Sequence, residues 1–328
     1  MSARIEVTIP LEVTITLSVG PADLHGEDSS LSRQTQRLTM GGYATTGTPL
    51  TPDLRLLKEN TLRDLQQSQS RIYFDEEQDI RDIGEYYRNV MLGDREDENF
   101  ATLSRLLDAT HTSKPAYSPA TQLYPWVDLH KVNGRLLIES IYSGQVFDAE
   151  DCIDDEFSIK ARRENVRRWW QENERYQTPE HSAIEELLDM VLPYNCEHVV
   201  PQSWFSRREP SRGDLHHLFA CEAACNSFRG NSPYSDFSVL EAERSLCGRL
   251  EDSGFEPSAG KGAVARATLY FLTRYPGSID LGMSRMNSER VHLLLNWSER
   301  HPVTEYERHR NQAIFQIQKN RNPFVDTH

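Results

Sequence analysis

The pattern of apolar and polar residues indicates a short β-rich start and a longer remainder dominated by helices. Residues 5–19 alternate branched apolar side chains with polar or charged ones, and Pro10 lies near the break between two such runs. This alternation is typical of a strand pair with one buried face, because successive side chains of a strand point to opposite faces. Residues 21–51 are rich in Ser, Thr, Gly and Pro without periodicity, which predicts a linker or mobile arm.

Helical spacing of apolar residues recurs through the rest of the chain. It predicts helices over residues 54–67, 76–91, 158–176, 179–192, 264–274 and 288–300. A last helix is predicted to begin at Thr304, because Thr304 and Glu307 form the T-x-x-E pattern of a capping box.

A hairpin and two acidic stretches lie between these helices. Residues 127–142 alternate in hydrophobicity around Asn133-Gly134, a pair that tolerates positive φ and favours a two-residue turn. We interpret the acidic residues 93–99 and 148–156 as solvated loops. Together the elements predict an α+β protein with a small β element in a helical surround.

Composition limits the classes of protein and the compartment. A net charge of −14 over 328 residues argues against a protein that coats nucleic acid over its whole surface, although a local basic groove stays open. No run approaches the ~20 apolar residues of a membrane span, and the first 19 residues do not resemble a secretory signal. Five cysteines, an odd number, suit a reducing compartment better than a disulfide scaffold. We therefore expect a cytoplasmic protein with no membrane partner.

The residues with the clearest chemical pattern lie between positions 195 and 236. There the pattern predicts a strand over 198–200, a polar loop over 206–213, a strand over 214–219 and a helix over 221–229. On that helix Asn226 and Arg229 are three residues apart and share a face. An amide oxygen and a guanidinium on one face suit the joint binding of a hard cation and a phosphate.

A phosphodiester resists hydrolysis because its negative charge repels a nucleophile and its leaving alkoxide is poor. A bound Mg²⁺ offsets both problems, and a general base deprotonates the attacking water. His198 suits the base role, since neutral imidazole is available near pH 7. Glu197 and Asn226 offer the oxygen ligands that Mg²⁺ or Ca²⁺ accepts. Neighbours on a regular strand point to opposite faces, so joint use of Glu197 and His198 predicts a bulge or a strand end there.

Three ordered motifs make a resemblance specific. They are E-H-V-V-P-x-S-W-F from Glu197, D-L-H-H-L from Asp214 and N-x-x-R-x-N from Asn226. This stretch resembles the bacterial endonuclease I family, non-specific nucleases of the His-Me finger (ββα-metal) type. The likeness covers about residues 70–328 and continues upstream in I-Y-S-G from Ile141 and downstream in N-R-N-P-F from Asn320.

The resemblance implies a metal-dependent endonuclease that cuts DNA, or RNA, with little sequence specificity. His198 would be the general base, and Glu197 and Asn226 would bind Mg²⁺, with Ca²⁺ or Mn²⁺ as substitutes. An arginine would steady the phosphate, and Arg229 and Arg212 are the candidates. The implied fold is a ββα-metal core embedded in a mainly helical domain.

The resemblance also divides the chain into domains. Residues 71–328 are expected to form the nuclease domain, and residues 1–70 match nothing in the family. We interpret residues 1–70 either as a module that docks a regulatory protein partner or as a strand pair that packs onto the nuclease and stabilises it.

Two other functions stay open. One is a hydrolase of another class that uses Cys196 as nucleophile near His198, although no third orienting group is evident. The other is a catalytically inactive relative that binds nucleic acid, against which the intact Glu197, His198 and Asn226 count.

Further polar and aromatic residues are expected to have structural roles. Asp214 is interpreted as a turn residue, or as a residue that supports the metal ligands, rather than as a ligand itself. His216 and His217 are interpreted as structural histidines. The thiols of Cys221 and Cys225 are interpreted as buried, with a zinc site that includes Cys196 and Cys152 as the alternative. The pair Trp169-Trp170 is expected in a core, with base stacking as the alternative.

Overall fold

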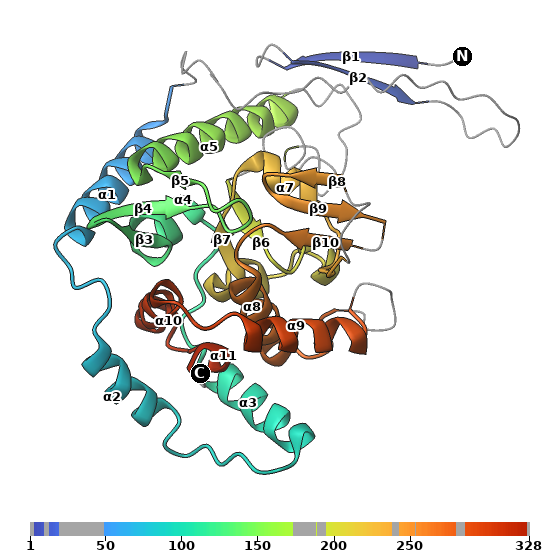
Figure 1. Cartoon of the computed structure of the whole chain (residues 1–328). Helices are drawn as coiled ribbons and strands as arrows, with labels where there is room; N and C mark the ends of the chain where they lie inside the picture. The colour runs from blue at the N-terminus through green and yellow to red at the C-terminus, as the bar shows by residue number, and fades with distance from the viewer. Residues whose placement is uncertain are drawn as a thin grey trace, which may run out of the picture. The chain divides into compact units, whose positions relative to one another are not determined.

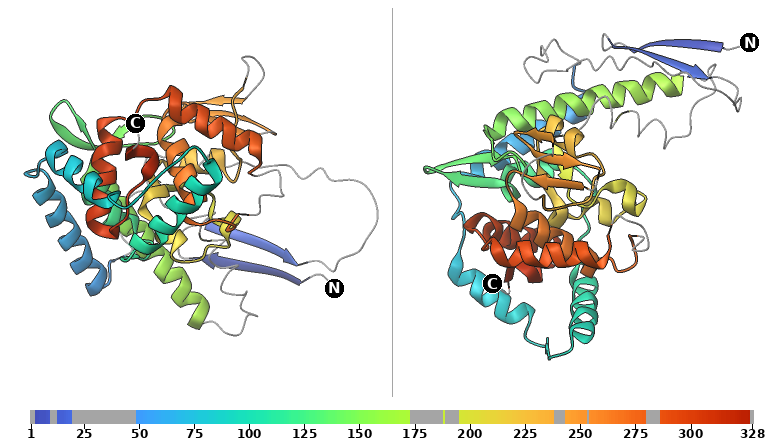
Figure 2. Two further views of the ribbon diagram at one scale, coloured as in Figure 1. Left: turned by 90° about the horizontal axis from the view of Figure 1, so that it is seen from below. Right: turned by 45° about the vertical axis from the view of Figure 1, so that its right-hand side comes forward.

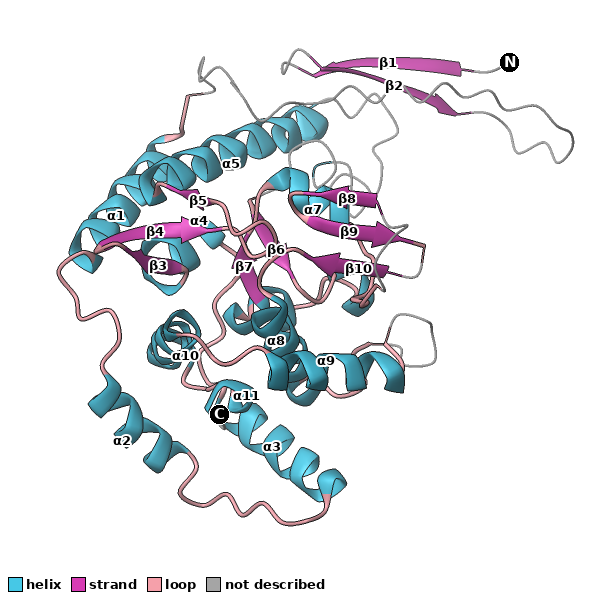
Figure 3. Cartoon of the chain, in the orientation of Figure 1, coloured by secondary structure: helices cyan, strands magenta, loops and turns pink. Residues whose placement is uncertain are grey.

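The computed structural model describes residues 3–9, 13–19, 49–172, 188, 195–237, 243–252, 254–279 and 286–326 (Figure 1). The chain divides into a smaller unit, Met1–Leu50 with Ser158–Leu192, and a larger unit, Thr51–Phe157 with Pro193–His328. Helices and small antiparallel sheets make up both, which confirms the predicted α+β class (Figure 3). The predicted boundary at residue 70 lies within the larger unit and remains a prediction.

The smaller unit contains the predicted strand pair. Strands β1 (Ala3–Ile9) and β2 (Val13–Val19) pair antiparallel, which confirms the predicted strand pair. The predicted mobile arm lies outside the described residues up to position 48, and so does the predicted helix over 179–192 apart from Leu188. The boundary between the two units lies within α5 (Ala149–Glu172), between Phe157 and Ser158.

Helices dominate the larger unit, and their starts follow from capping. Its helices include α1 (Pro52–Ser68), α2 (Glu76–Tyr86), α3 (Glu96–Thr110), α4 (Pro119–Gln122), the π-helical turn η1 (Leu123–Val127), α8 (Lys261–Arg274), α9 (Ser288–Arg300), α10 (Glu305–Gln318) and α11 (Pro323–Asp326). The Thr51 hydroxyl accepts a hydrogen bond from Leu54 N at 3.3 Å at the start of α1. The predicted capping box of Thr304 and Glu307 is present at the start of α10 and is confirmed.

The strands of the larger unit form small antiparallel sheets. They are β3 (Leu129–Val132), β4 (Arg135–Glu139) and β5 (Val146–Phe147); β6 (Cys196–His198) and β7 (Leu218–Ala220); and β8 (Glu243–Ser245), β9 (Gly248–Glu251) and β10 (Gly254–Pro257). Asn133 and Gly134 connect β3 to β4 with φ of 50° and 79°, so the predicted hairpin turn is confirmed.

Both acidic stretches were wrongly predicted as loops. Helix α3 begins at Glu96 and α5 at Ala149, so most of each stretch is helical. The first turn of each helix is acidic, with Glu96, Asp97 and Glu98 in α3 and Glu150 and Asp151 in α5. Free backbone amides and the helix dipole favour negative charge at that position. An Asp148 carboxylate oxygen also accepts a hydrogen bond from Glu150 N at 2.9 Å. The predicted helix over residues 76–91 is shorter, because α2 ends at Tyr86.

One apolar core connects the short β6–β7 hairpin to the helices behind it. Val199, Phe219 and Phe271 belong to the same buried cluster as Trp297. Helix α8 is buried along most of its length and packs against α9 (Figure 2). The β6–β7 hairpin therefore packs on a rigid base.

No helix within the described residues is long and apolar enough to cross a membrane.

One buried ion pair and the hydrogen bonds around it connect distant segments to this core. The Arg310 guanidinium pairs with Asp128 and donates to the carbonyls of Leu215 and Leu218, just before and within β7. Asp128 also accepts a hydrogen bond from Ala220 N at 2.5 Å. The Leu218 end of β7 is thereby connected to α10, and the Ala220 end is connected to Asp128, the residue that precedes β3.

Candidate active site

The predicted order of strand, loop, strand and helix is confirmed, with shifted bounds. Strand β6 pairs antiparallel with β7, so that Glu197 lies opposite Phe219 and His198 opposite Leu218. Helix α7 (Ala223–Arg229) follows β7 directly. The connecting loop contains the 3₁₀ turns η2 (Gln202–Phe205), η3 (Ser211–Gly213) and η4 (Leu215–His217).

Glu197 is a buried carboxylate with 2% of its surface exposed. Its Oε1 atom accepts a hydrogen bond from the Tyr142 hydroxyl at 2.8 Å and another from the Arg229 guanidinium. Within the described part of the chain, Oε2 accepts no hydrogen bond. Burial raises the pKa of Glu197 above its usual value, against the opposing effects of Arg229 and Tyr142.

Arg229 lies at the C-terminal end of α7 with 1% of its surface exposed. Besides Glu197, its guanidinium donates to the backbone carbonyls of Ser232, His198 and Val199 at 3.0, 3.1 and 3.0 Å. These contacts connect α7 to β6. The phosphate-binding role predicted for Arg229 remains a prediction, and the guanidinium would have to leave these partners to perform it.

Asn226 lies one turn before Arg229 and contacts the same strand. Its Nδ2 atom donates to the Cys196 carbonyl at 3.1 Å. Because the amide nitrogen is used in this way, Oδ1 is the atom that remains for a ligand. Asn226 and Arg229 therefore share a helix face, as predicted, and that face contacts β6.

His198 is the last residue of β6, so that of the two predicted arrangements, a bulge or a strand end, the structure has the strand end. Its Nε2 atom lies 3.0 Å from the Arg212 carbonyl. A carbonyl can only accept, so Nε2 carries the proton and Nδ1 holds the free lone pair. Burial lowers the pKa of His198 well below its usual value, and the neighbouring His217, 5.3 Å away between ring centroids, lowers it further. The imidazole is thus neutral near pH 7.

Arg212 lies beside His198. Its position in the loop between the two strands was the only reason to select it from the sequence. Its Nε atom donates to Gln202 Oε1 at 2.9 Å, and its guanidinium lies over the Tyr117 ring at 4.9 Å. The Tyr117 ring is itself 4.9 Å from the His198 ring. Arg212 is only half-buried, so this cation, unlike Arg229, is accessible to a ligand.

Asp214, His216 and His217 support the loop, as predicted. Burial lowers the pKa of the two histidines to about 3 and about 4. His217 Nε2 donates to the Ser211 carbonyl at 2.6 Å. Burial raises the pKa of Asp214, but His111 and the two histidines outweigh it and bring the value to about 2. The carboxylate accepts hydrogen bonds from Tyr270 and Tyr275 at 2.8 and 2.9 Å.

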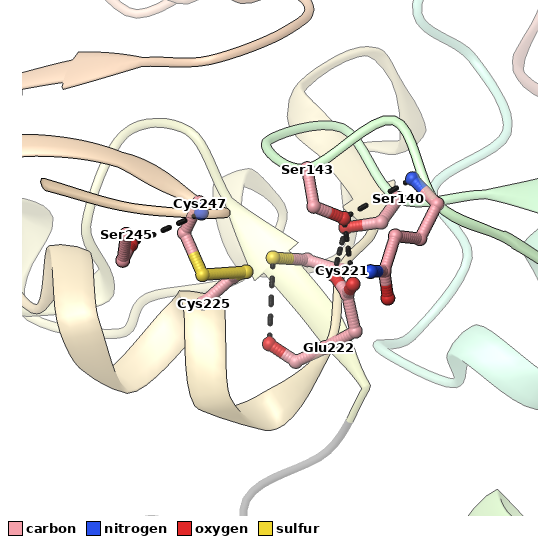
Figure 4. The surroundings of a disulfide bond; sticks show 8 residues. Ser140, Ser143, Cys221, Glu222, Cys225, Ser245 and Cys247 are labelled. Atoms are coloured by element: carbon pink, nitrogen blue, oxygen red, sulfur yellow. Dashed lines mark hydrogen bonds between the residues drawn. A yellow bond between two sulfur atoms is a disulfide. The ribbon is translucent and has the colours of Figure 1, made fainter.

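Sequence reasoning did not select the residues that hold the site from outside the hairpin. Tyr142 and Tyr234 are hydrogen-bonded to each other at 2.8 Å beside Glu197. Glu222, the N-cap of α7, accepts hydrogen bonds from Ser140 and from Ser143, the latter at 2.6 Å (Figure 4). The I-Y-S-G motif was the only signal for this segment, and it carried no indication of what the tyrosine contacts.

The cysteines correct one expectation. Cys225 on α7 and Cys247 in the turn between β8 and β9 form a disulfide with an S–S distance of 2.03 Å (Figure 4). The expectation that all thiols stay reduced is therefore wrong for this pair. The zinc alternative is wrong as well, because a disulfide sulfur carries no thiolate for the metal. No group of three or more His, Cys, Asp or Glu side chains is arranged to hold a metal among the described residues.

The alternative nucleophile, Cys196, is poorly placed for that role. Only 3% of its surface is exposed, and burial raises the pKa of its thiol well above the usual value. The reactive form of a cysteine is the thiolate, so a buried and protonated Cys196 is not activated. His198 instead uses its Nε2 atom on the Arg212 carbonyl.

The sequence of this chain is similar to those of known nucleases. The family model described as Endonuclease I matches residues 102–328. The chain is 31% identical over 150 residues to an extracellular ribonuclease of Bacillus subtilis (strain 168), covering 42% of the chain and 52% of that relative. It is 31% identical over 127 residues to an extracellular deoxyribonuclease of Aeromonas hydrophila, covering 37% and 51%.

A third similar protein is named Endonuclease-1, from Buchnera aphidicola subsp. Baizongia pistaciae (strain Bp). The identity is 30% over 118 residues, covering 34% of the chain and 45% of the relative. The chain thus spans about half the length of the curated relatives that it matches.

Proposed function

Because this chain belongs to the endonuclease I family, we propose that it is an endonuclease that hydrolyses phosphodiester bonds with the help of a Mg²⁺-type ion. One observation carries the proposal: a neutral histidine with a free Nδ1 lies next to a buried carboxylate with a free Oε2, on one strand. A base and a hard oxygen ligand in this position are what the reaction requires.

The supporting fold is the β6–β7 hairpin followed by α7, which we propose is the ββα-metal core of a His-Me finger. Asn226 Nδ2 on the Cys196 carbonyl and Arg229 on the His198 carbonyl dock α7 against β6. The helix thereby brings its amide side chain to the strand that carries Glu197 and His198.

Glu197 and Asn226 fit a hard divalent cation. Oε2 of Glu197 and Oδ1 of Asn226 are oxygen donors, and both are left over after the other atoms of their side chains are bonded within the protein. A bound Mg²⁺, or Ca²⁺ or Mn²⁺ in its place, supplies positive charge to the scissile phosphate and to the leaving oxygen. Water and phosphate oxygens are expected to complete its coordination.

His198 is the proposed general base. Its Nδ1 atom takes the proton of the attacking water, and the Arg212 carbonyl stabilises the resulting imidazolium through the Nε2 hydrogen bond. Arg212 is the proposed phosphate ligand, because its guanidinium is half-buried beside His198. Arg229 is the other candidate phosphate ligand. Its hydrogen bonds to Glu197 and to the Val199 carbonyl favour a role in holding these groups in place.

The substrate is proposed to be DNA, with RNA as a second substrate. The named relatives include both a ribonuclease and a deoxyribonuclease, so their names do not choose between the two. A site that contacts phosphate through Arg212 and metal through Glu197 reads no base, and little sequence specificity is therefore expected.

The compartment is proposed to be an oxidising one. The Cys225–Cys247 disulfide counts against the expected cytoplasm, because cytosolic thiols are kept reduced. Relatives named extracellular or periplasmic support the same proposal.

The test is cleavage by the purified full chain of supercoiled plasmid, linear DNA and a folded RNA, each with Mg²⁺ and with EDTA. We expect nicked and linearised plasmid only with the metal, and the same products from substrates of unrelated sequence. Cleavage that persists in EDTA, or binding without cleavage, would contradict the proposal. The second result would favour the inactive nucleic-acid-binding alternative.

A further inference from the structure

The two oxygens of the Glu197 carboxylate have different surroundings. Oε1 accepts both the Tyr142 hydroxyl, at 2.8 Å, and the Arg229 guanidinium, whereas Oε2 accepts neither. Two donors on the same oxygen oppose rotation of the carboxylate, since a turn that exchanged the oxygens would break both bonds. Charge-assisted hydrogen bonds of this kind are the stronger ones in proteins.

Resting on the proposed function, we propose that Tyr142 is a positioning residue: with Arg229 it occupies Oε1 of Glu197 and presents Oε2 as the metal-binding oxygen. Tyr142 touches neither substrate nor metal in this proposal and acts through Glu197 alone. Partners of a metal ligand orient that ligand and contribute to metal affinity.

The direction of the hydrogen bonds supports this role. A carboxylate oxygen beside an arginine only accepts, so the Tyr142 hydroxyl donates to Glu197. The Tyr142 oxygen then accepts from the Tyr234 hydroxyl at 2.8 Å. Tyr234 in turn lies under the Arg229 guanidinium at 4.8 Å. The two tyrosines and the arginine thus form one buried network that ends on Oε1.

The backbone around Tyr142 is fixed from both sides. Its carbonyl accepts from Ala259 N, and Ile141 N donates to the carbonyl of Ala220, each at 2.9 Å. Its ring packs edge-on against Phe255 with centroids 4.9 Å apart. Tyr142 is therefore a rigid support, and removal of its hydroxyl leaves the ring packing in place.

The experiment compares Tyr142→Phe with a matched control, Tyr87→Phe. Tyr87 donates to Asp326 Oδ2 at 2.8 Å, and Asp326 pairs with Arg321. The control therefore removes the same tyrosine-to-carboxylate bond from a similar arginine–carboxylate pair that the proposed site does not include. Circular dichroism and thermal unfolding check that both full-length variants are folded.

The first readout is binding of Mn²⁺ alone, followed by the loss of the free-ion EPR signal. We expect Tyr142→Phe to raise the Mn²⁺ dissociation constant by about 10- to 100-fold, the usual scale for removing a partner of a metal ligand. The control is expected to match the wild type. The second readout is plasmid cleavage against Mg²⁺ concentration, where Tyr142→Phe should need more Mg²⁺ but approach wild-type kcat at saturation.

Failure of this proposal and failure of the proposed function give different results. If the wild type binds Mn²⁺ and cleaves DNA, and Tyr142→Phe does both with unchanged metal dependence, the positioning role is wrong and the nuclease stands. If the wild type neither binds Mn²⁺ nor cleaves DNA, the proposed function is wrong, and the positioning role of Tyr142 is then wrong as well.

A second variant covers the case in which Tyr142→Phe does not fold. Tyr234→Phe removes the donor to the Tyr142 oxygen and leaves the bond to Glu197 in place. We expect a rise of about 2- to 5-fold in the Mn²⁺ dissociation constant, because neighbouring hydrogen bonds in a buried network strengthen one another. No change in that constant would overturn the proposal.

Discussion

The ring nitrogens of His198 have different neighbours, and this difference predicts a pH profile. Nε2 is held by the Arg212 carbonyl, so the proposed base is Nδ1. Burial lowers the pKa of His198 well below its usual value. The base is active when deprotonated, and a lowered pKa keeps it deprotonated in more acidic solution. We expect the acid limb of kcat/KM to have its midpoint below pH 6.5, the ordinary value for histidine; a midpoint above it contradicts the assignment.

Removal of the imidazole tests the same residue directly. We expect His198→Ala to lower kcat by at least ~10²-fold, the usual scale for losing a general base, while the thermal unfolding midpoint changes little. The control is His292→Ala, which removes an exposed histidine from α9. Near-normal turnover by a folded His198→Ala would show that another group is the base.

At the scale of elements, the loop between β6 and β7 depends on a glycine at the end of η3. A Cβ atom at Gly213 would lie 2.2 Å from the Pro115 carbonyl oxygen, so the backbone would have to shift. Gly213 follows Arg212, whose carbonyl orients His198. We expect Gly213→Ala to destabilise the fold by about 1–3 kcal/mol, the cost of overpacking, and to lower kcat by about 10-fold or more through misplacement of His198.

The matched control for Gly213 is Gly84→Ala in α2. A Cβ atom at Gly84 meets nothing within 4 Å. Alanine in the middle of a helix is favoured over glycine by about 0.5–1 kcal/mol, so this variant should be as stable as the wild type or more stable. Chemical denaturation and plasmid cleavage measure both variants. Equal behaviour of the two would show that the close approach at Gly213 has no functional consequence.

The disulfide connects α7 to the β8–β9 hairpin across a sequence separation of 22 residues. A loop of this length predicts that its removal by Cys225→Ser with Cys247→Ser lowers the free energy of unfolding by about 3 kcal/mol. Urea denaturation of oxidised protein measures the difference. Cys152→Ser removes an unpaired, half-buried thiol and serves as the control. If the two losses are equal, the bridge adds no stability.

At the scale of the whole molecule, the larger unit contains every residue of the proposed site. Helix α1 keeps its own N-cap, Thr51, and buries Leu54 and Leu65 within that unit. We therefore expect a chain without residues 1–48 to fold and to cleave DNA at the full-length rate or faster. Soluble expression, circular dichroism and plasmid cleavage measure the outcome.

The same truncation separates the two interpretations of residues 1–70. A docking or regulatory module predicts that the truncated chain is more toxic to the expressing cell than the full chain, because a restraint is removed. An insoluble truncated product would show that the first residues stabilise the fold instead. Unchanged activity and unchanged toxicity would leave no regulatory role for residues 1–48.

The sequence by itself determined the features that depend on near neighbours. The turn at Asn133-Gly134, the capping box of Thr304 and Glu307 and the strand–loop–strand–helix order around His198 were all predicted and confirmed. Each follows from backbone preference or hydrogen bonding among residues a few positions apart. The acidic helix starts were missed because charge alone does not separate a solvated loop from a first helical turn.

Only the tertiary structure decided which groups meet across long separations. Tyr142 reaches Glu197 over 55 positions, and Arg229 turns toward β6 from 32 positions away. Local periodicity gave no indication of either contact, or of the pairing of Cys225 with Cys247. These contacts form because folding closes several loops around one core, and the buried polar groups must then find partners wherever that core places them.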